Sequence, residues 1–185
     1  VDGVFRRLNR EVWVVTAADT DRRGGLLATY VSQASLDPAA PMVLIGIAAN
    51  HFTRDLIDAS QGFAVHLLCP DQTDVALNFA IGSGRDRDKL ANLSVRRGAT
   101  GAPLLRECLA WMECRVGGAY DAGDRIYYWA DVTDGQALSE DAPLCEHELM
   151  AAASEEQLQA LRANLAHDIQ VQRPMIEAWR RRAGS

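Results

Sequence analysis

The sequence predicts a mainly β domain, a small β-barrel with short helices inserted between its strands, followed by a C-terminal helical arm. Three observations favour this fold class. About six or seven β-rich runs bounded by turn residues follow one another before residue 140. Long helices are scarce between these runs, which favours a small barrel over a doubly wound sheet. From Ser154 onward, the apolar residues recur at helical spacing instead.

The first strands and the first helix are expected within residues 11–60. The segment "EVWVVTAAD" (11–19) is β-rich and ends in a polar turn, and "LLATYVS" (26–32) is expected to be the return strand. The run "MVLIGIA" (42–48) is apolar throughout and bounded by turns, which predicts a strand buried on both faces. A short helix is expected over 53–60, with Thr53 as its N-cap.

The middle of the chain continues the β pattern. The run "FAVHLLC" (63–69) predicts another buried strand, in which His66 is expected to be a packed side chain rather than a catalytic base. Asp71 can cap a helix that continues through "QTDVALNFA" (72–80), and a charged loop, "IGSGRDRDKL", follows. The segment 109–138 then predicts two long strands around the turn "DAGD".

The last part of the chain predicts an amphipathic helical arm, so we divide the sequence into a domain over 1–150 and an arm over 151–185. Ser154 and Gln157 form a capping box, and Pro174 is expected to interrupt the helix. The arm is expected to bury one apolar stripe, on its own barrel or on a second subunit, made of Leu158, Leu161, Leu165, Ile169, Met175, Ile176 and Trp179.

Composition excludes several classes of function. The chain has 185 residues and a formal net charge of −6, which argues against a nucleic-acid or anionic-membrane surface. Its longest apolar run is far shorter than a membrane span. None of the four cysteines lies in a CxxC pair, which favours reduced thiols and a cytoplasmic protein. The run "CEHE" (145–148) is expected to be a solvated strand end rather than a metal site.

Two segments carry the polar groups expected of a ligand site. The stretch "GGLLATYVSQASLDP" (24–38) holds more hydroxyl and amide groups than an ordinary core strand. In "GIAANHFTRDL" (46–56), a buried strand runs into a helix start, whose free N–H groups can bind an anion with help from Asn50, His51 and Thr53. Simple helix capping is the alternative. The glycines of "GSGRDR" lack the third glycine and the preceding strand of a dinucleotide fingerprint.

The sequence resembles the flavin reductase-like, FMN-binding split-barrel family, a Greek-key barrel fold. The resemblance is carried by "VWVVTAAD", "GGLLATYVSQASLDPAAPMVLIGIAANHFTRDLIDASQGFAVHLL", "NFA", "GRDRDKL", "GAPLLRECLAWMECRV" and "AGDRIYYWADV", in the order that the family has them. It covers about residues 8–145. The flavin reductase domain of flavodiiron proteins shows a particularly similar pattern.

The resemblance implies a flavin site. Ala28, Thr29, Tyr30 and Val31 would flank the isoalloxazine ring and ribityl chain, and Ser32 and Ser35 would bond ribityl or phosphate oxygens. The phosphate would lie at the helix start, beside Ala48, Asn50, His51 and Thr53, with Arg85 or Arg87 adding positive charge. A single helix start suits one terminal phosphate, so we expect FMN, with FAD as the alternative.

The resemblance also implies an NAD(P)H:flavin oxidoreductase, a homodimer, and reduced flavin or electrons handed to an acceptor protein. Arg125 stands where the family places a histidine near the nicotinamide, which makes Arg125 the candidate for that site. The substitution also favours an alternative, a flavin-binding electron carrier or sensor without its own nicotinamide site. A third alternative is a binding module that uses no flavin.

Overall fold

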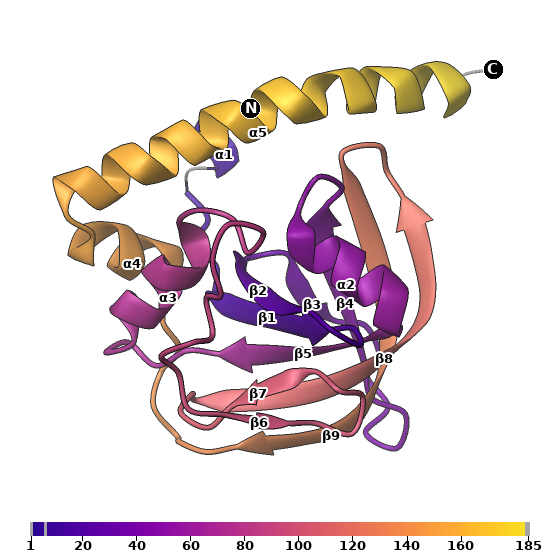
Figure 1. Ribbon diagram of the computed structural model, residues 1–185, viewed down its shortest axis with the longest axis vertical. Coiled ribbons are helices and arrows are strands. Elements are labelled where there is room, and N and C mark those ends of the chain that lie inside the picture. Colours follow the sequence, from indigo (N-terminus) through magenta and orange to yellow (C-terminus); the bar gives the residue numbers. More distant parts are fainter. Residues whose placement is uncertain (1, 6, 184–185) are drawn as a thin grey trace.

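The computed structural model describes residues 2–5 and 7–183. Its centre is a curled seven-stranded sheet with antiparallel neighbours in the order β2-β1-β5-β8-β9-β4-β3, beside a small β6–β7 hairpin (Figure 1). The strands are β1 (Trp13–Ala18), β2 (Arg23–Ala28), β3 (Val31–Gln33), β4 (Met42–Ala48), β5 (Gly62–Leu67), β6 (Val95–Arg97), β7 (Pro103–Leu105), β8 (Ala110–Asp121) and β9 (Arg125–Ala137).

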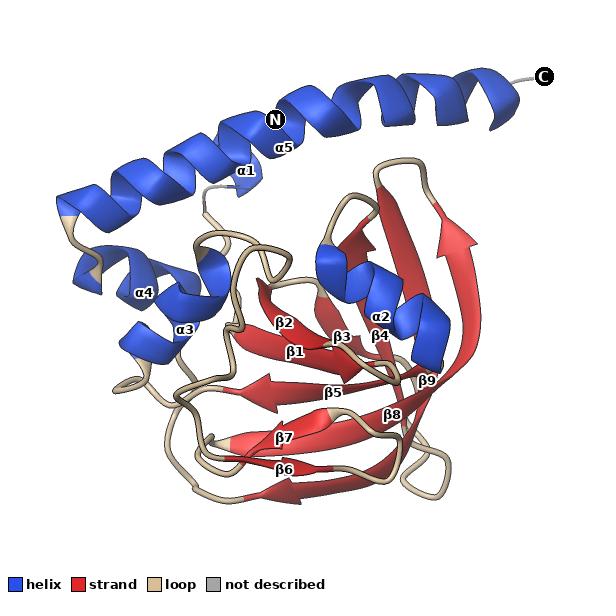
Figure 2. Cartoon of the chain, in the orientation of Figure 1, coloured by secondary structure: helices blue, strands red, loops and turns tan. Residues whose placement is uncertain are grey.

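The helices sit around the sheet, with the longest one lying across one end of the barrel (Figure 2). They are α1 (Asp2–Phe5), α2 (Phe52–Ser60), α3 (Thr73–Ala80), α4 (Glu146–Ala152) and α5 (Glu155–Ala183). The mainly β barrel with short helices and a C-terminal arm, as expected from the sequence, is therefore confirmed.

The apolar strands enclose two core clusters. One cluster contains Val14, Phe79 and Leu104, and α3 contributes to it. The other contains Ile45 and Phe63 together with the inward side chains of α2. β4 is buried along almost its whole length because both of its faces are covered, as its unbroken apolar run predicted.

The expected return strand over 26–32 is wrong as a single element. β2 ends at Ala28 and β3 begins at Val31, and the two strands lie at opposite edges of the sheet. Tyr30 lies in the break between the two strands, and its carbonyl accepts the Gly46 N–H of β4 at 2.9 Å. Two strands that follow each other in the chain can sit at opposite edges because the sheet curls back on itself.

Local expectations at the helix ends are partly corrected. His51, rather than Thr53, is the N-cap of α2, and Gln72, rather than Asp71, precedes α3. The capping box of α5 is confirmed, because the Ser154 N–H donates to Gln157 Oε1 at 2.8 Å and the Gln157 N–H donates to Ser154 Oγ at 3.2 Å. The run "CEHE" starts helix α4 rather than ending a strand.

The arm differs most from its prediction. Pro174 lies inside a continuous α5 and does not interrupt it. The chain's own barrel does not cover the middle of the expected stripe, where Leu165 is 61% exposed and Ile169 is 47% exposed. The buried residue of α5 is Gln172, because this part of the helix faces polar groups at the start of α2 rather than the apolar core.

His66 is a structural side chain, as expected. Its Nδ1 lies 3.1 Å from the Val14 carbonyl, and its Nε2 accepts the Leu105 N–H at 3.1 Å. An Nε2 that accepts a hydrogen bond carries no proton, so the ring is neutral and Nδ1–H is the donor. Burial lowers the pKa of His66 from 6.5 to about 4.

We therefore expect an acid limb in folding stability, that is, a fall in the free energy of unfolding as the pH is lowered from 6.5 to about 4. The unfolded chain binds a proton at His66 as the pH falls below 6.5, whereas the folded protein does so only near 4. The free energy of unfolding should fall across that interval, because protons favour the unfolded state. Urea unfolding between pH 7 and pH 4 measures this, and the limb should flatten in His66→Gln but persist in His147→Gln, which changes an exposed histidine. Equal limbs in all three proteins would contradict the assignment.

Candidate functional site

A cavity of about 380 Å³ lies at the start of α2. β2, the first turn of α2, the 82–86 loop and Lys89 form its walls, and α5 covers it with Asn164, His167 and Asp168. Figure 1 shows α5 passing over this end of the barrel. The arm thus belongs to the same site as the segment "AANHFT" that the sequence singled out.

The cavity presents hydrogen-bond donors that the protein leaves unused. His51 caps α2 without a side-chain bond to the helix, and the N–H groups of Phe52 and Thr53 donate to no other described residue. The Thr53 side chain is only 2% exposed, and its hydroxyl has no hydrogen-bond partner within the described chain. Free N–H groups at a helix start, together with an unpartnered hydroxyl of a residue that lines the cavity, fit an anion such as a phosphate ester.

Lys89 adds a cation to the cavity, and sequence reasoning missed it. Lys89 is the only lysine in the chain, it is 4% exposed, and its Nζ donates to the Phe79 carbonyl at 2.7 Å. Burial, with a smaller contribution from nearby Arg87, lowers the pKa of Lys89 to about 8. A single lysine within the loop "GRDRDKL" was the signal in the sequence.

The two arginines expected to add charge behave differently. Arg85 lines the cavity, donates to the Asn50 carbonyl at 3.1 Å and pairs with Asp55. Arg87 instead donates to Asn78 Oδ1 and to the Asn78 carbonyl, both at 2.7 Å, at the end of α3. Arg87 therefore holds the loop against α3 and does not line this cavity.

The carboxylate of Asp168, on α5, contacts two of the residues that were expected to bind the phosphate. Asn50 Nδ2 donates to Asp168 Oδ1 at 2.9 Å, and His51 Nε2 lies 3.1 Å from Asp168 Oδ2. Gln172 Nε2 donates to Asn50 Oδ1 at 3.1 Å. Asn50 and His51 are therefore engaged by α5, while Thr53 stays free.

Tyr30 and Arg125 contact each other outside the α2 cavity. The Arg125 guanidinium stacks over the Tyr30 ring at 4.6 Å from its centroid, and Arg10 lies over the same ring at 5.4 Å. Tyr30 remains 43% exposed, whereas Ala28 and Ala48 are buried in the core. The structure thus gathers an aromatic ring and two cations from three distant segments.

Val31, Ser32 and Ser35 lie apart from the α2 cavity. They line a different, mostly apolar cavity of about 550 Å³, together with side chains of β1, β4 and β8. The Ser32 hydroxyl donates to the Gln33 carbonyl, and Ser35 Oγ accepts the Asp37 N–H. Thr29 lies in the bend between β2 and β3 and lines neither cavity. Within the described chain, the predicted flavin ligands therefore do not all meet at one place.

Comparisons with known proteins place this geometry in context. The family model of the flavin reductase like domain matches residues 5–150. An NADH-dependent FMN reductase of Streptomyces nodosus subsp. asukaensis is 31% identical over 153 residues, which cover 77% of this chain and 80% of that protein. The solved flavin reductase component of a bacterial two-component tryptophan halogenase is 32% identical with a TM-score of 0.70, and the match covers 80% of this chain and 91% of that one.

A further relative is longer than this chain. High molecular weight rubredoxin of Moorella thermoacetica is 30% identical over 135 residues, 72% of this chain. The match spans 58% of that rubredoxin, and it spans 26% of a related diflavin flavoprotein of a Nostoc strain. Among the described helices, none combines the length and apolar character that crossing a membrane requires.

Proposed function

Because this chain belongs to the flavin reductase like domain family, we propose that it is an NAD(P)H:flavin oxidoreductase. The observation that carries the proposal is the set of unused donors at the start of α2: two N–H groups and the Thr53 hydroxyl. Lys89 adds a positive charge beside them. Such a set suits the phosphate end of a flavin nucleotide.

The chain's own residues supply binding and orientation. Bound flavin would supply the redox chemistry, since it accepts a hydride from reduced nicotinamide. The N–H groups of Phe52 and Thr53, the Thr53 hydroxyl and Lys89 Nζ would hold the phosphate and so fix the rest of the cofactor. Arg125 is a fixed cation at an exposed ring, and we propose that it contacts the phosphates of the nicotinamide dinucleotide or the flavin edge.

Steady-state oxidation of NADH and NADPH, with FMN or FAD added, tests the function directly. The visible absorption spectrum of the purified protein before and after addition of FMN tests flavin binding separately. Flavin-dependent oxidation together with a perturbed flavin spectrum is expected. A perturbed spectrum without oxidation would favour an electron carrier, and neither result would favour a binding module that uses no flavin.

An electron carrier without its own nicotinamide site is the second candidate function. It is favoured by Arg125, which stands in place of the family's histidine. The Arg125 guanidinium stacks on the Tyr30 ring, and its Nε lies 3.9 Å from Asp124 Oδ2. If the reductase proposal holds, Arg125→Ala should lower kcat/KM for NADH or NADPH by about fivefold or more, since a cation that contacts the dinucleotide is lost. Arg115→Ala, an exposed arginine of β8, is the control. A change within twofold would remove Arg125 from the nicotinamide site.

The assembly and cellular setting are also proposals. Leu165 and Ile169 leave an exposed apolar strip on α5, which supports a homodimer in which this strip is covered. An acceptor protein for reduced flavin is proposed by analogy with the two-component relative. All four thiols are free, and burial raises the pKa of Cys114 to about 12, which suits reduced, unreactive cysteines in a cytoplasmic protein. Light scattering of the full chain tests the dimer.

FMN affinity should depend on pH through Lys89. Below its pKa of about 8 the ammonium can bind a phosphate, and above it the charge is lost. If the bound phosphate raises this pKa by about one unit, the dissociation constant should rise about fivefold between pH 7 and pH 9. Fluorescence titration with FMN measures this, and riboflavin, which lacks the phosphate, should show no such rise. An identical pH dependence in Lys89→Gln would show that another group titrates.

A further inference from the structure

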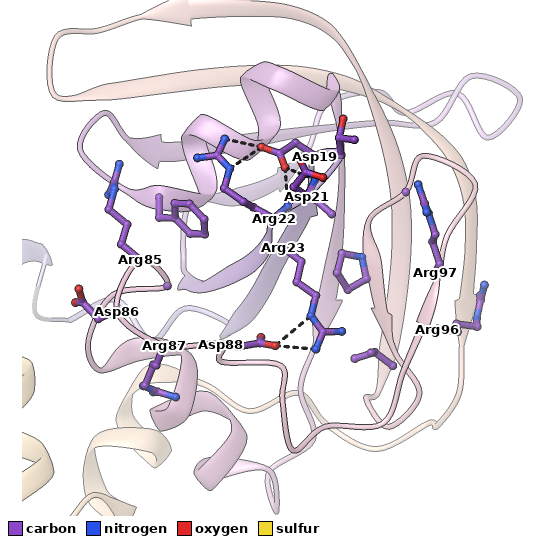
Figure 3. Close-up of a pocket in the computed structure, with 17 residues that line it drawn as sticks. Asp19, Asp21, Arg22, Arg23, Arg85, Asp86, Arg87, Asp88, Arg96 and Arg97 are labelled. Atoms are coloured by element: carbon purple, nitrogen blue, oxygen red, sulfur yellow. Dashed lines mark hydrogen bonds and ion pairs between the residues drawn. The ribbon is translucent and has the colours of Figure 1, made fainter.

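A second polar cavity, of about 1030 Å³, opens on the other side of the α2 start. Its walls come from the β1–β2 turn, Phe52, the 84–88 loop and β6. Figure 3 shows the charged side chains that line it. Six arginines and four aspartates line it, a formal excess of two positive charges in a chain whose net charge is −6. The flavin phosphate proposed above does not account for this cavity.

The arginines are not equally engaged. Arg22 donates through two of its nitrogens to the partly buried Asp19 carboxylate, whereas Arg23 pairs with Asp88 at 2.7 Å at an exposed position, where such pairs are weak (Figure 3). Arg96 stacks on the Trp111 ring at 4.6 Å. Arg97 has no carboxylate partner in the part of the chain that the structure describes. Within the described chain, Arg97 is thus a cation without a carboxylate partner, beside Arg23, whose own ion pair is exposed.

The two cavities adjoin at the helix start, because Phe52, Gly84, Arg85 and Asp86 line both of them. The arginine-lined cavity is therefore the neighbouring site for any part of a ligand that continues beyond a phosphate at the N–H groups of Phe52 and Thr53. FMN ends at its phosphate and would leave this cavity empty, whereas FAD continues with a second phosphate and adenosine.

We propose that the arginine-lined cavity binds the adenosine-phosphate portion of a dinucleotide, with FAD as the first source and NADPH as the other. The proposal rests on the proposed flavin function. Phe52 lines the cavity, and the guanidinium groups of Arg22 and Arg85 lie over its ring, 5.6 and 5.5 Å from the ring centroid. Aromatic rings and guanidinium planes are the groups on which a base stacks, and arginine binds phosphate bidentately. The cavity volume is of the order of small-molecule sites, about 300–1,000 Å³.

Titrations of the full chain with FAD and with FMN test the proposal. Arg22→Ala/Arg97→Ala should weaken FAD about tenfold and leave FMN within twofold, because only FAD reaches these arginines. Arg106→Ala removes an exposed arginine outside the cavity and should change neither. If the double variant is unstable, Arg97→Gln alone serves, since its side chain is exposed. The Michaelis constants for NADPH and NADH are measured with the same proteins.

The outcomes separate the sources. A loss confined to FAD assigns the cavity to the flavin, and a rise confined to the NADPH Michaelis constant assigns it to the nicotinamide nucleotide. Equal losses for FAD and FMN, or no change with any nucleotide, would overturn the proposal. If the wild-type protein binds no FMN, the flavin function fails, and calorimetry with ADP alone decides the cavity: binding lost in the variant supports it, and no binding refutes it.

Discussion

Replacing Thr53 by valine together with Lys89 by glutamine should weaken FMN binding by about 2–4 kcal/mol, on the order of 30- to 800-fold. The estimate combines one neutral and one charge-assisted hydrogen bond to phosphate. Thr53 has a free hydroxyl, and Lys89, the cavity's buried cation, uses one of its three N–H donors on the Phe79 carbonyl and keeps two for a ligand. Valine keeps the shape of threonine, and glutamine retains a donor for the Phe79 carbonyl.

The control variant removes the same kinds of group elsewhere. Thr73→Val changes a threonine at the start of α3, and Arg106→Gln removes an exposed cation, both outside the cavity. The control should bind FMN like the wild type, and riboflavin affinity should be similar in all three proteins. If FMN affinity is unchanged in the Thr53 and Lys89 variant, with a normal melting temperature, the phosphate does not bind at the start of α2.

Asp168→Asn should have the opposite effect and tighten FMN binding about tenfold, or about 1.4 kcal/mol. Asp168 is a residue of α5 that lines the α2 cavity, and its carboxylate contacts Asn50 and His51. A phosphate entering the cavity meets this like charge at close range, where repulsion amounts to a few kcal/mol before solvent screening reduces it. Asparagine keeps the size and a hydrogen-bond acceptor, so α5 should remain in place.

Salt and a second acidic residue provide the checks on this prediction. The gain in affinity should shrink as the ionic strength rises, because screening weakens the repulsion in the wild type. Glu177→Gln removes an exposed charge from the same helix away from the cavity and should leave FMN affinity unchanged. Weaker FMN binding by Asp168→Asn would mean that Asp168 helps to hold the flavin rather than opposing its phosphate.

Much of the fold was predictable because it depends on neighbours in the sequence. The apolar run 42–48 predicted β4 with its bounds, and the pattern around "DAGD" predicted the β8–β9 hairpin. The Ser154 and Gln157 side chains fix the start of α5 through bonds to each other's backbone. The buried strand that runs into a helix start predicted the free N–H groups at the start of α2, because such groups are a local property of any helix beginning.

Only the tertiary structure decided what surrounds that helix start. The break between β2 and β3 follows from closure of the sheet, which sequence periodicity does not encode. Arg87 and Lys89 lie two positions apart, yet only Lys89 lines the cavity, since the path of the loop sets which side chain turns inward. Asp168 meets Asn50 across 118 positions of sequence. Such contacts depend on how α5 packs over the barrel, and the helical period of α5 alone predicted an apolar face there, where the structure places Asp168 and Gln172 against polar partners.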